Sequence, residues 1–175
     1  MTVSPNFSDF QKEYEAGRNQ VVFSKLTSDL ETPVSIMLKL AGAKKNSFIL
    51  ESVTGGETRG RYSIIGMEPD LIWKCEGNHS FHSSGKDEFT NIKGNPLTVF
   101  RNILEQSKIN LPDDLPQASA GLFGYFGYDM VRHVEDLPNT NPDKIGLPDA
   151  MFIRPTIIAV LDGVKGEVIL VSPVF

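Results

Sequence analysis

The sequence predicts an α+β fold, in which mixed, largely antiparallel sheets form a sandwich with a few flanking helices. About seven to nine β-rich runs are separated by turn residues, and three or four segments have helical spacing. Regular alternation of strands and helices is absent, which disfavours a doubly wound parallel sheet. With 175 residues, the chain can bury a real core, and we expect residues 1–175 to form a single domain.

Three of the four predicted helices begin at a capping signal. The first spans residues 7–16, with Ser8 as its cap. Thr32 and Asn95 each precede a proline, which is typical of a helix start, and open helices over residues 34–43 and from residue 96 onward. A short fourth helix begins at Asp129.

The helical spacing also predicts which side chains face the core. The predicted apolar stripes are Phe7, Phe10 and Tyr14 in the first helix, Val34, Met37, Leu38 and Ala41 in the second, and Leu97, Phe100, Ile103 and Leu104 in the third.

The strands are predicted from β-rich runs bounded by turn residues. They cover residues 21–26, 47–53, 62–66, 70–76, a hairpin over 79–90 that turns at Ser84-Gly85, 120–128, and a last hairpin of 151–161 and 167–174. Residues 54–61 (TGGETRGR) form a loop, because three glycines in eight residues do not continue a strand.

Composition narrows the classes of function. The net charge is −5, whereas domains that bind nucleic acid or anionic membranes usually carry a basic surplus, so neither is an expected partner. The single cysteine excludes an internal disulfide. Neither a signal peptide nor an apolar run long enough to cross a bilayer is visible, so we expect a soluble, cytoplasmic protein.

Several reactive residue types have an ordinary structural explanation. His79 and His82 lie three apart on a strand, which points them to opposite faces, so we expect no metal site. Cys75 lies in an apolar strand and is expected to be buried and structural. Gly121, Gly124 and Gly127 are expected at bends or close backbone contacts. We identify no catalytic residue.

One region has the composition of a small-ligand site. Glu51 and Ser52 end an apolar strand, and the loop with Arg59 and Arg61 follows at once. A zwitterionic amino acid needs an anion for its ammonium, donors for its carboxylate and an apolar slot, and this region could supply all three. The alternatives are a plain strand end and a flexible hairpin loop; the loop lacks the Gly-Lys-Ser/Thr ending of a phosphate-binding loop.

Three stretches, in this order, resemble anthranilate synthase component I. They are DLETPV (29–34), FILESVTGGETRGRYSIIG (48–66) and GLFGYFGYDMVRHVEDLP (121–138). The resemblance extends from about residue 20 to the end, and it implies the α+β fold of the N-terminal part of that family.

The resemblance implies a regulatory role. In the family, chorismate and glutamine-derived ammonia give anthranilate, a glutamine amidotransferase component II is the partner, and Mg²⁺ assists at a C-terminal chorismate-binding region that we expect to be absent here. The family's tryptophan-inhibitor pocket maps onto Leu50, Glu51, Ser52, Arg61, Tyr62 and Ser63. We therefore expect residues 1–175 to be the regulatory domain of a longer chain, itself without activity, cofactor or metal site.

Three other interpretations stay open. The motifs Leu50–Ser52 and Gly60–Ser63 also occur in aminodeoxychorismate synthase component I, although the DLETPV helix start favours anthranilate synthase. The chain could instead be a stand-alone amino-acid-binding module. It could also be a scaffold that docks the amidotransferase and binds no ligand.

Overall fold

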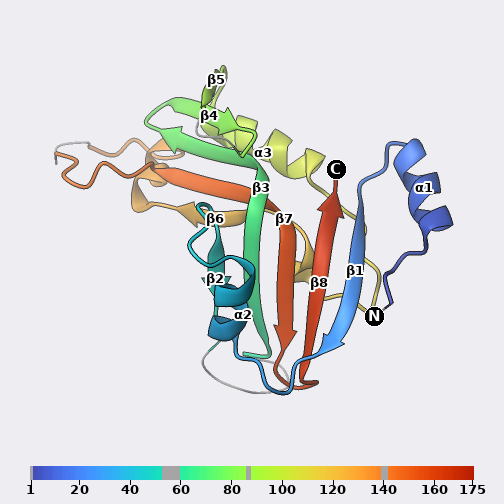
Figure 1. Cartoon of the computed structure of the whole chain (residues 1–175). Helices are drawn as coiled ribbons and strands as arrows, with labels where there is room; N and C mark the ends of the chain where they lie inside the picture. Colours follow the sequence, from blue (N-terminus) through green and yellow to red (C-terminus); the bar gives the residue numbers. More distant parts are fainter. Residues whose placement is uncertain (1, 53–59, 86–87, 139–141) are drawn as a thin grey trace. The chain divides into compact units, whose positions relative to one another are not determined.

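A computed structural model describes residues 2–52, 60–85, 88–138 and 142–175 of the chain (Figure 1). Eight strands and three α-helices are found in these residues. The strands are β1 (Gln20–Thr27), β2 (Phe48–Leu50), β3 (Tyr62–Glu76), β4 (His79–Ser83), β5 (Thr90–Ile92), β6 (Phe123–Phe126), β7 (Ala150–Asp162) and β8 (Glu167–Val174). The helices are α1 (Phe7–Glu15), α2 (Pro33–Leu40) and α3 (Pro96–Gln106), with short 3-10 helices at Gln117–Ser119 and Tyr128–His133.

The strands form one hydrogen-bonded network in the order β1-β8-β7-β3-β4-β5, with β2 on β3 and β6 on β7. The pairs β1–β8, β2–β3, β3–β4, β4–β5, β6–β7 and β7–β8 are antiparallel. The predicted α+β class and the antiparallel pairing are therefore confirmed.

The chain divides into two compact units. The first comprises residues 1–69, 107–121 and 155–175, and the second comprises residues 70–106 and 122–154. That residues 1–175 form one regulatory domain stays a prediction.

In the first unit, α2 packs on one face of the sheet. Ile36 of α2 forms a core with Ile65 and Met67 of β3, and Ala159, Leu161 and Val168 of β7 and β8 complete this core. Thr32 caps α2 as predicted: its Oγ1 accepts from the Ser35 backbone N–H at 3.1 Å, and its own N–H donates to the Ser35 Oγ at 2.9 Å.

In the second unit, α3 packs over β3 and β7. Its Val99 and Ile103 pack with Trp73 and Cys75 of β3, both of which are fully buried. The ring of Phe100 lies 4.9 Å from that of Trp73 and 4.7 Å from that of Phe152. Asn95 caps α3 as predicted, since its Oδ1 accepts from the backbone N–H of Leu97 at 3.0 Å.

Four local predictions are wrong in whole or in part. Residues 62–66 and 70–76 belong to one strand, β3, which runs through Pro69; within it Glu68 has a left-handed conformation (φ 52°). Asn6, not Ser8, caps α1, with its Oδ1 accepting from the Asp9 N–H at 3.0 Å. In the second predicted helix, Met37 and Ala41 pack in the core as predicted, but Ile36 is buried as well, and Val34 and Leu38 are exposed. In α3, Leu97, Phe100 and Ile103 pack in the core as predicted, but Val99 is also buried and Leu104 is exposed.

The aromatic residues of α1 also depart from the expected burial. Phe7 and Tyr14 are 76% and 61% exposed, and no residue of α1 is fully buried. The helix therefore presents its aromatic stripe largely to the surface.

Candidate ligand-binding site

The structure brings the two halves of the predicted site together. Strands β2 and β3 are antiparallel, with Leu50 opposite Ile64. Just beyond β2, the Ser52 N–H donates to the Ser63 Oγ at 3.3 Å. Residues 53–59, which include Arg59 and most of the glycine-rich loop, lie outside the described residues. The segments 50–52 and 61–63 thus meet side by side at one end of this strand pair.

The side chains of these segments differ in exposure. Leu50 is 53% exposed, and Glu51 is also exposed. Ser52, Arg61 and Tyr62 are half-buried, and Ser63 is buried. The two segments thus carry an exposed carboxylate, an exposed apolar side chain and two serine hydroxyl groups. Such groups could receive the ammonium and the apolar side chain of an amino acid.

Arg61 is engaged by a residue far away in the sequence. Its Nε donates to Oδ1 of Asp162 at 2.9 Å, and its Nη2 donates to Oδ2 at 2.5 Å. The guanidinium carbon also lies 5.0 Å from the centre of the Tyr62 ring. A ligand carboxylate approaching Arg61 would therefore compete with a bidentate partner already in place.

Asp162 is held by more than Arg61. It ends β7 and is 4% exposed, and its Oδ1 also accepts from the backbone N–H groups of Val164 and Lys165 at 3.0 and 3.2 Å. The hydrogen bonds from Arg61 lower the pKa of the Asp162 carboxyl below its ordinary value, against the opposing effect of burial, and the two backbone donors add to this. The carboxylate is therefore charged at neutral pH. The sequence predicted only a turn at Asp162-Gly163.

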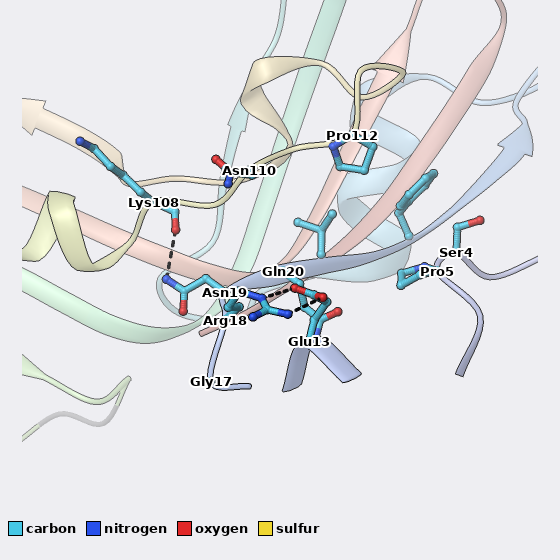
Figure 2. Close-up of a pocket in the computed structure, with 12 residues that line it drawn as sticks. Ser4, Pro5, Glu13, Gly17, Arg18, Asn19, Gln20, Lys108, Asn110 and Pro112 are labelled. Atoms are coloured by element: carbon cyan, nitrogen blue, oxygen red, sulfur yellow. Dashed lines mark hydrogen bonds and ion pairs between the residues drawn. The ribbon is translucent and has the colours of Figure 1, made fainter. Parts of the chain in front are cut away.

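The cavity in Figure 2 lies elsewhere in the first unit. It has a volume of about 720 Å³ and is lined by the end of α1, the start of β1 and residues around 108–112. None of the six predicted site residues lines it. Its polar groups largely satisfy one another: Arg18 pairs with Glu13, and the Asn19 Nδ2 donates to the Lys108 carbonyl at 3.1 Å (Figure 2). The candidate site at 50–52 and 61–63 therefore does not coincide with this cavity and stays a prediction.

The other reactive residue types occupy ordinary positions. Cys75 is buried as predicted, with its Sγ donating to the Gly77 carbonyl at 3.3 Å and lying 3.7 Å from His133 Nε2. Burial, with the nearby charges of Asp149 and Glu76, raises the pKa of its thiol to about 11, so it is protonated at neutral pH. His79 and His82 are exposed on β4.

The described residues contain neither a cluster of metal ligands nor a membrane-spanning helix. Within the described residues, no group of three or more His, Cys, Asp or Glu side chains could hold a metal ion. No helix in that same part of the chain is long and apolar enough to cross a membrane.

The chain is similar in sequence to known bacterial proteins. Anthranilate synthase component 1 of Cereibacter sphaeroides is 54% identical over 172 residues, which are 96% of this chain and 34% of that protein. Anthranilate synthase component 1 of Synechocystis sp. is 33% identical over 168 residues, which are 95% of this chain and 33% of that protein. The chain is a relative of anthranilate synthase component I.

A solved structure agrees with the sequences. The crystal structure of anthranilate synthase component I from Streptococcus pneumoniae matches with a TM-score of 0.54 and 26% identity, over 82% of this chain and 30% of that one. No protein-family model matches the chain. The predicted resemblance to anthranilate synthase component I is thus confirmed, and the chain spans about a third of the length of the curated relatives it matches.

Proposed function

We propose that this chain is the N-terminal, tryptophan-binding regulatory segment of an anthranilate synthase component I. The parent enzyme would make anthranilate from chorismate and glutamine-derived ammonia, in the first step of tryptophan biosynthesis, under feedback inhibition by L-tryptophan. The observation that carries this proposal is the 54% identity to anthranilate synthase component 1 over 96% of the chain.

The chemistry would belong to other parts of the assembly. A chorismate-binding region of the same longer chain would supply the catalytic groups and hold Mg²⁺. A glutamine amidotransferase component II would deliver ammonia. We place this assembly in the cytoplasm, and we assign no catalytic residue to the present chain.

The regulatory ligand would bind at Leu50, Glu51, Ser52, Arg61, Tyr62 and Ser63. The hydrogen bond between Ser52 and Ser63 supports this assignment, because it joins the two segments into one surface. Exposed Glu51 would face the ligand ammonium, and Leu50 would contact the indole. Bound tryptophan would inhibit the parent enzyme by stabilising a conformation that turns over chorismate poorly. This requires that tryptophan binds that conformation more tightly than it binds the active conformation.

The first test is calorimetric titration with L-tryptophan, with L-phenylalanine as the control ligand. It is run on this 175-residue chain and on the full-length encoded protein. We expect saturable heat with tryptophan on the full-length protein. No heat on either protein would overturn the proposal, whereas heat on the full-length protein alone would mean that further residues complete the pocket.

The second test is Ser52→Phe in the full-length protein. The larger side chain would fill the pocket beside Ser63, so we expect tryptophan binding to weaken by at least about tenfold, or 1.4 kcal/mol. Ser84→Phe, at an exposed serine of the β4–β5 hairpin, is the matched control and should bind as the wild type does. Unchanged binding by Ser52→Phe would remove this serine from the site.

A further inference from the structure

We propose that Asp162 is a positioning residue for the tryptophan site, acting through Arg61. This inference rests on the proposed function and extends it to a residue outside the predicted motifs. Asp162 lies 101 positions from Arg61 in the sequence, yet it binds that guanidinium through both carboxylate oxygens.

The backbone of Arg61 is hydrogen-bonded to the β7–β8 turn. Gly163 N–H donates to the Arg61 carbonyl at 2.9 Å, directly beside the side-chain pair. Arg61 is therefore fixed to the β7–β8 turn through its main chain and its side chain together. Since Tyr62 and Ser63 follow at once, this anchor sets where β3 begins and where those two site residues lie.

The Asp162 carboxylate also orients the guanidinium of Arg61. The Asp162 side chain is 3% exposed and that of Arg61 is 26% exposed, so water screens this pair less than it screens the surface pairs of the chain. Two parallel hydrogen bonds define the plane of the guanidinium, which a single contact would leave free to rotate. The same group lies over the Tyr62 ring. The carboxylate thus orients Arg61, and Arg61 in turn covers Tyr62.

Asp162 is itself held in place by the backbone of the β7–β8 turn. Its Oδ1 accepts from two backbone N–H groups of the turn, those of Val164 and Lys165. The turn thus holds the carboxylate by bonds that do not involve Arg61. Asparagine has one oxygen and one NH₂ group in place of two equivalent oxygens. It can keep the turn bonds but cannot accept both hydrogen bonds of Arg61.

The experiment measures the tryptophan dissociation constant of the full-length encoded protein by calorimetry. We expect Asp162→Asn to weaken binding by about tenfold, or 1.4 kcal/mol. Asp70→Asn is the matched control, because Arg154 binds Asp70 through the same two donors at 2.8 and 2.9 Å and that pair shares no residue with the site. The control should bind tryptophan as the wild type does.

A double-mutant cycle shows whether Asp162 acts through Arg61. In an Arg61→Gln background, Asp162→Asn should add little to the loss, because the group it orients is gone. Fully additive losses would overturn the inference. If Asp162→Asn does not fold, Asp162→Glu keeps the charge but displaces it by one methylene, and it should still weaken binding.

The outcomes separate the two proposals. If the wild type does not bind tryptophan, the proposed function fails, and the inference fails with it. If the wild type binds and Asp162→Asn or Asp162→Glu binds equally well, the inference alone fails. An equal loss in Asp70→Asn would also overturn it, because the effect would then be one of general stability.

Discussion

Asp162 combines nearly complete burial with a negative charge, which is costly unless the charge is paired. Arg61 and two backbone N–H groups provide that pairing. Because these donors bind the ionised form, the pKa of Asp162 is lower in the folded chain than in the unfolded chain. The pair therefore links the stability of the first unit to pH.

This linkage predicts how Asp162→Asn behaves across pH. A lowered folded-state pKa contributes stability above the unfolded pKa of about 3.9, and this contribution is lost as the pH falls through the folded pKa. We expect the variant to be about 1–3 kcal/mol less stable than the wild type at pH 7. The difference should shrink as the pH falls below about 4, because the unfolded carboxyl then takes up a proton while the native one is still ionised, and it should vanish once the native carboxyl is protonated as well. Urea unfolding at pH 7, 5 and 3 would measure it, and a constant difference would contradict this account.

At the residue scale, the site was only partly predictable. Leu50 to Ser52 and Arg61 to Ser63 stood out because polar residues and a glycine-rich loop interrupt apolar strands. Asp162 did not, because turn aspartates are common and nothing local indicates a partner 101 positions away. The close contact at Gly124 was predicted correctly: a Cβ there would lie 2.0 Å from the Met151 carbonyl oxygen. Local backbone geometry can be predicted from the sequence. Pairs such as Arg61 and Asp162, which are far apart in the sequence, depend on how the strands associate.

Among the helices, the starts of α2 and α3 were predictable, whereas the buried face of α2 was predicted only in part. Thr32-Pro33 and Asn95-Pro96 each begin a helix because the capping side chain satisfies free backbone N–H groups. The sequence of α2, PVSIMLKL, is apolar on nearly every side, so its periodicity does not decide which side faces the sheet. The fit of Ile36 against Ile65 and Met67 decides it.

A pair of variants tests the observed face of α2. Ile36 is 6% exposed and Leu38 is 67% exposed. We expect Ile36→Ala to cost about 2–5 kcal/mol, because it leaves a cavity in the core. Leu38→Ala should change the free energy of unfolding by no more than about 0.5 kcal/mol. Urea unfolding of both proteins gives the comparison, and equal losses would mean that α2 packs differently.

At the scale of the molecule, two strands belong to both compact units. β3 contributes Tyr62–Pro69 to the first unit and Asp70–Glu76 to the second, and β7 is divided at Arg154 and Pro155. The β7–β8 hairpin was predicted from its Asp-Gly turn, but the pairing of β1 with β8, which sets Gln20 opposite Val174, was not. That pairing joins the two ends of the chain, and only the packing of the whole sheet selects it.

The shared strands predict that the two units unfold together. Trp73 is the only tryptophan of the chain, is fully buried and belongs to the second unit, so its fluorescence reports on that unit. Far-UV circular dichroism reports on all helices and strands, and in urea we expect the two transitions to coincide. Ile36→Ala, a change in the first unit, should then lower the fluorescence midpoint as much as the dichroism midpoint. If Ile36→Ala leaves the fluorescence midpoint unchanged, the second unit unfolds on its own. Strands β3 and β7 would then each lose their structure on one side of the division between the units.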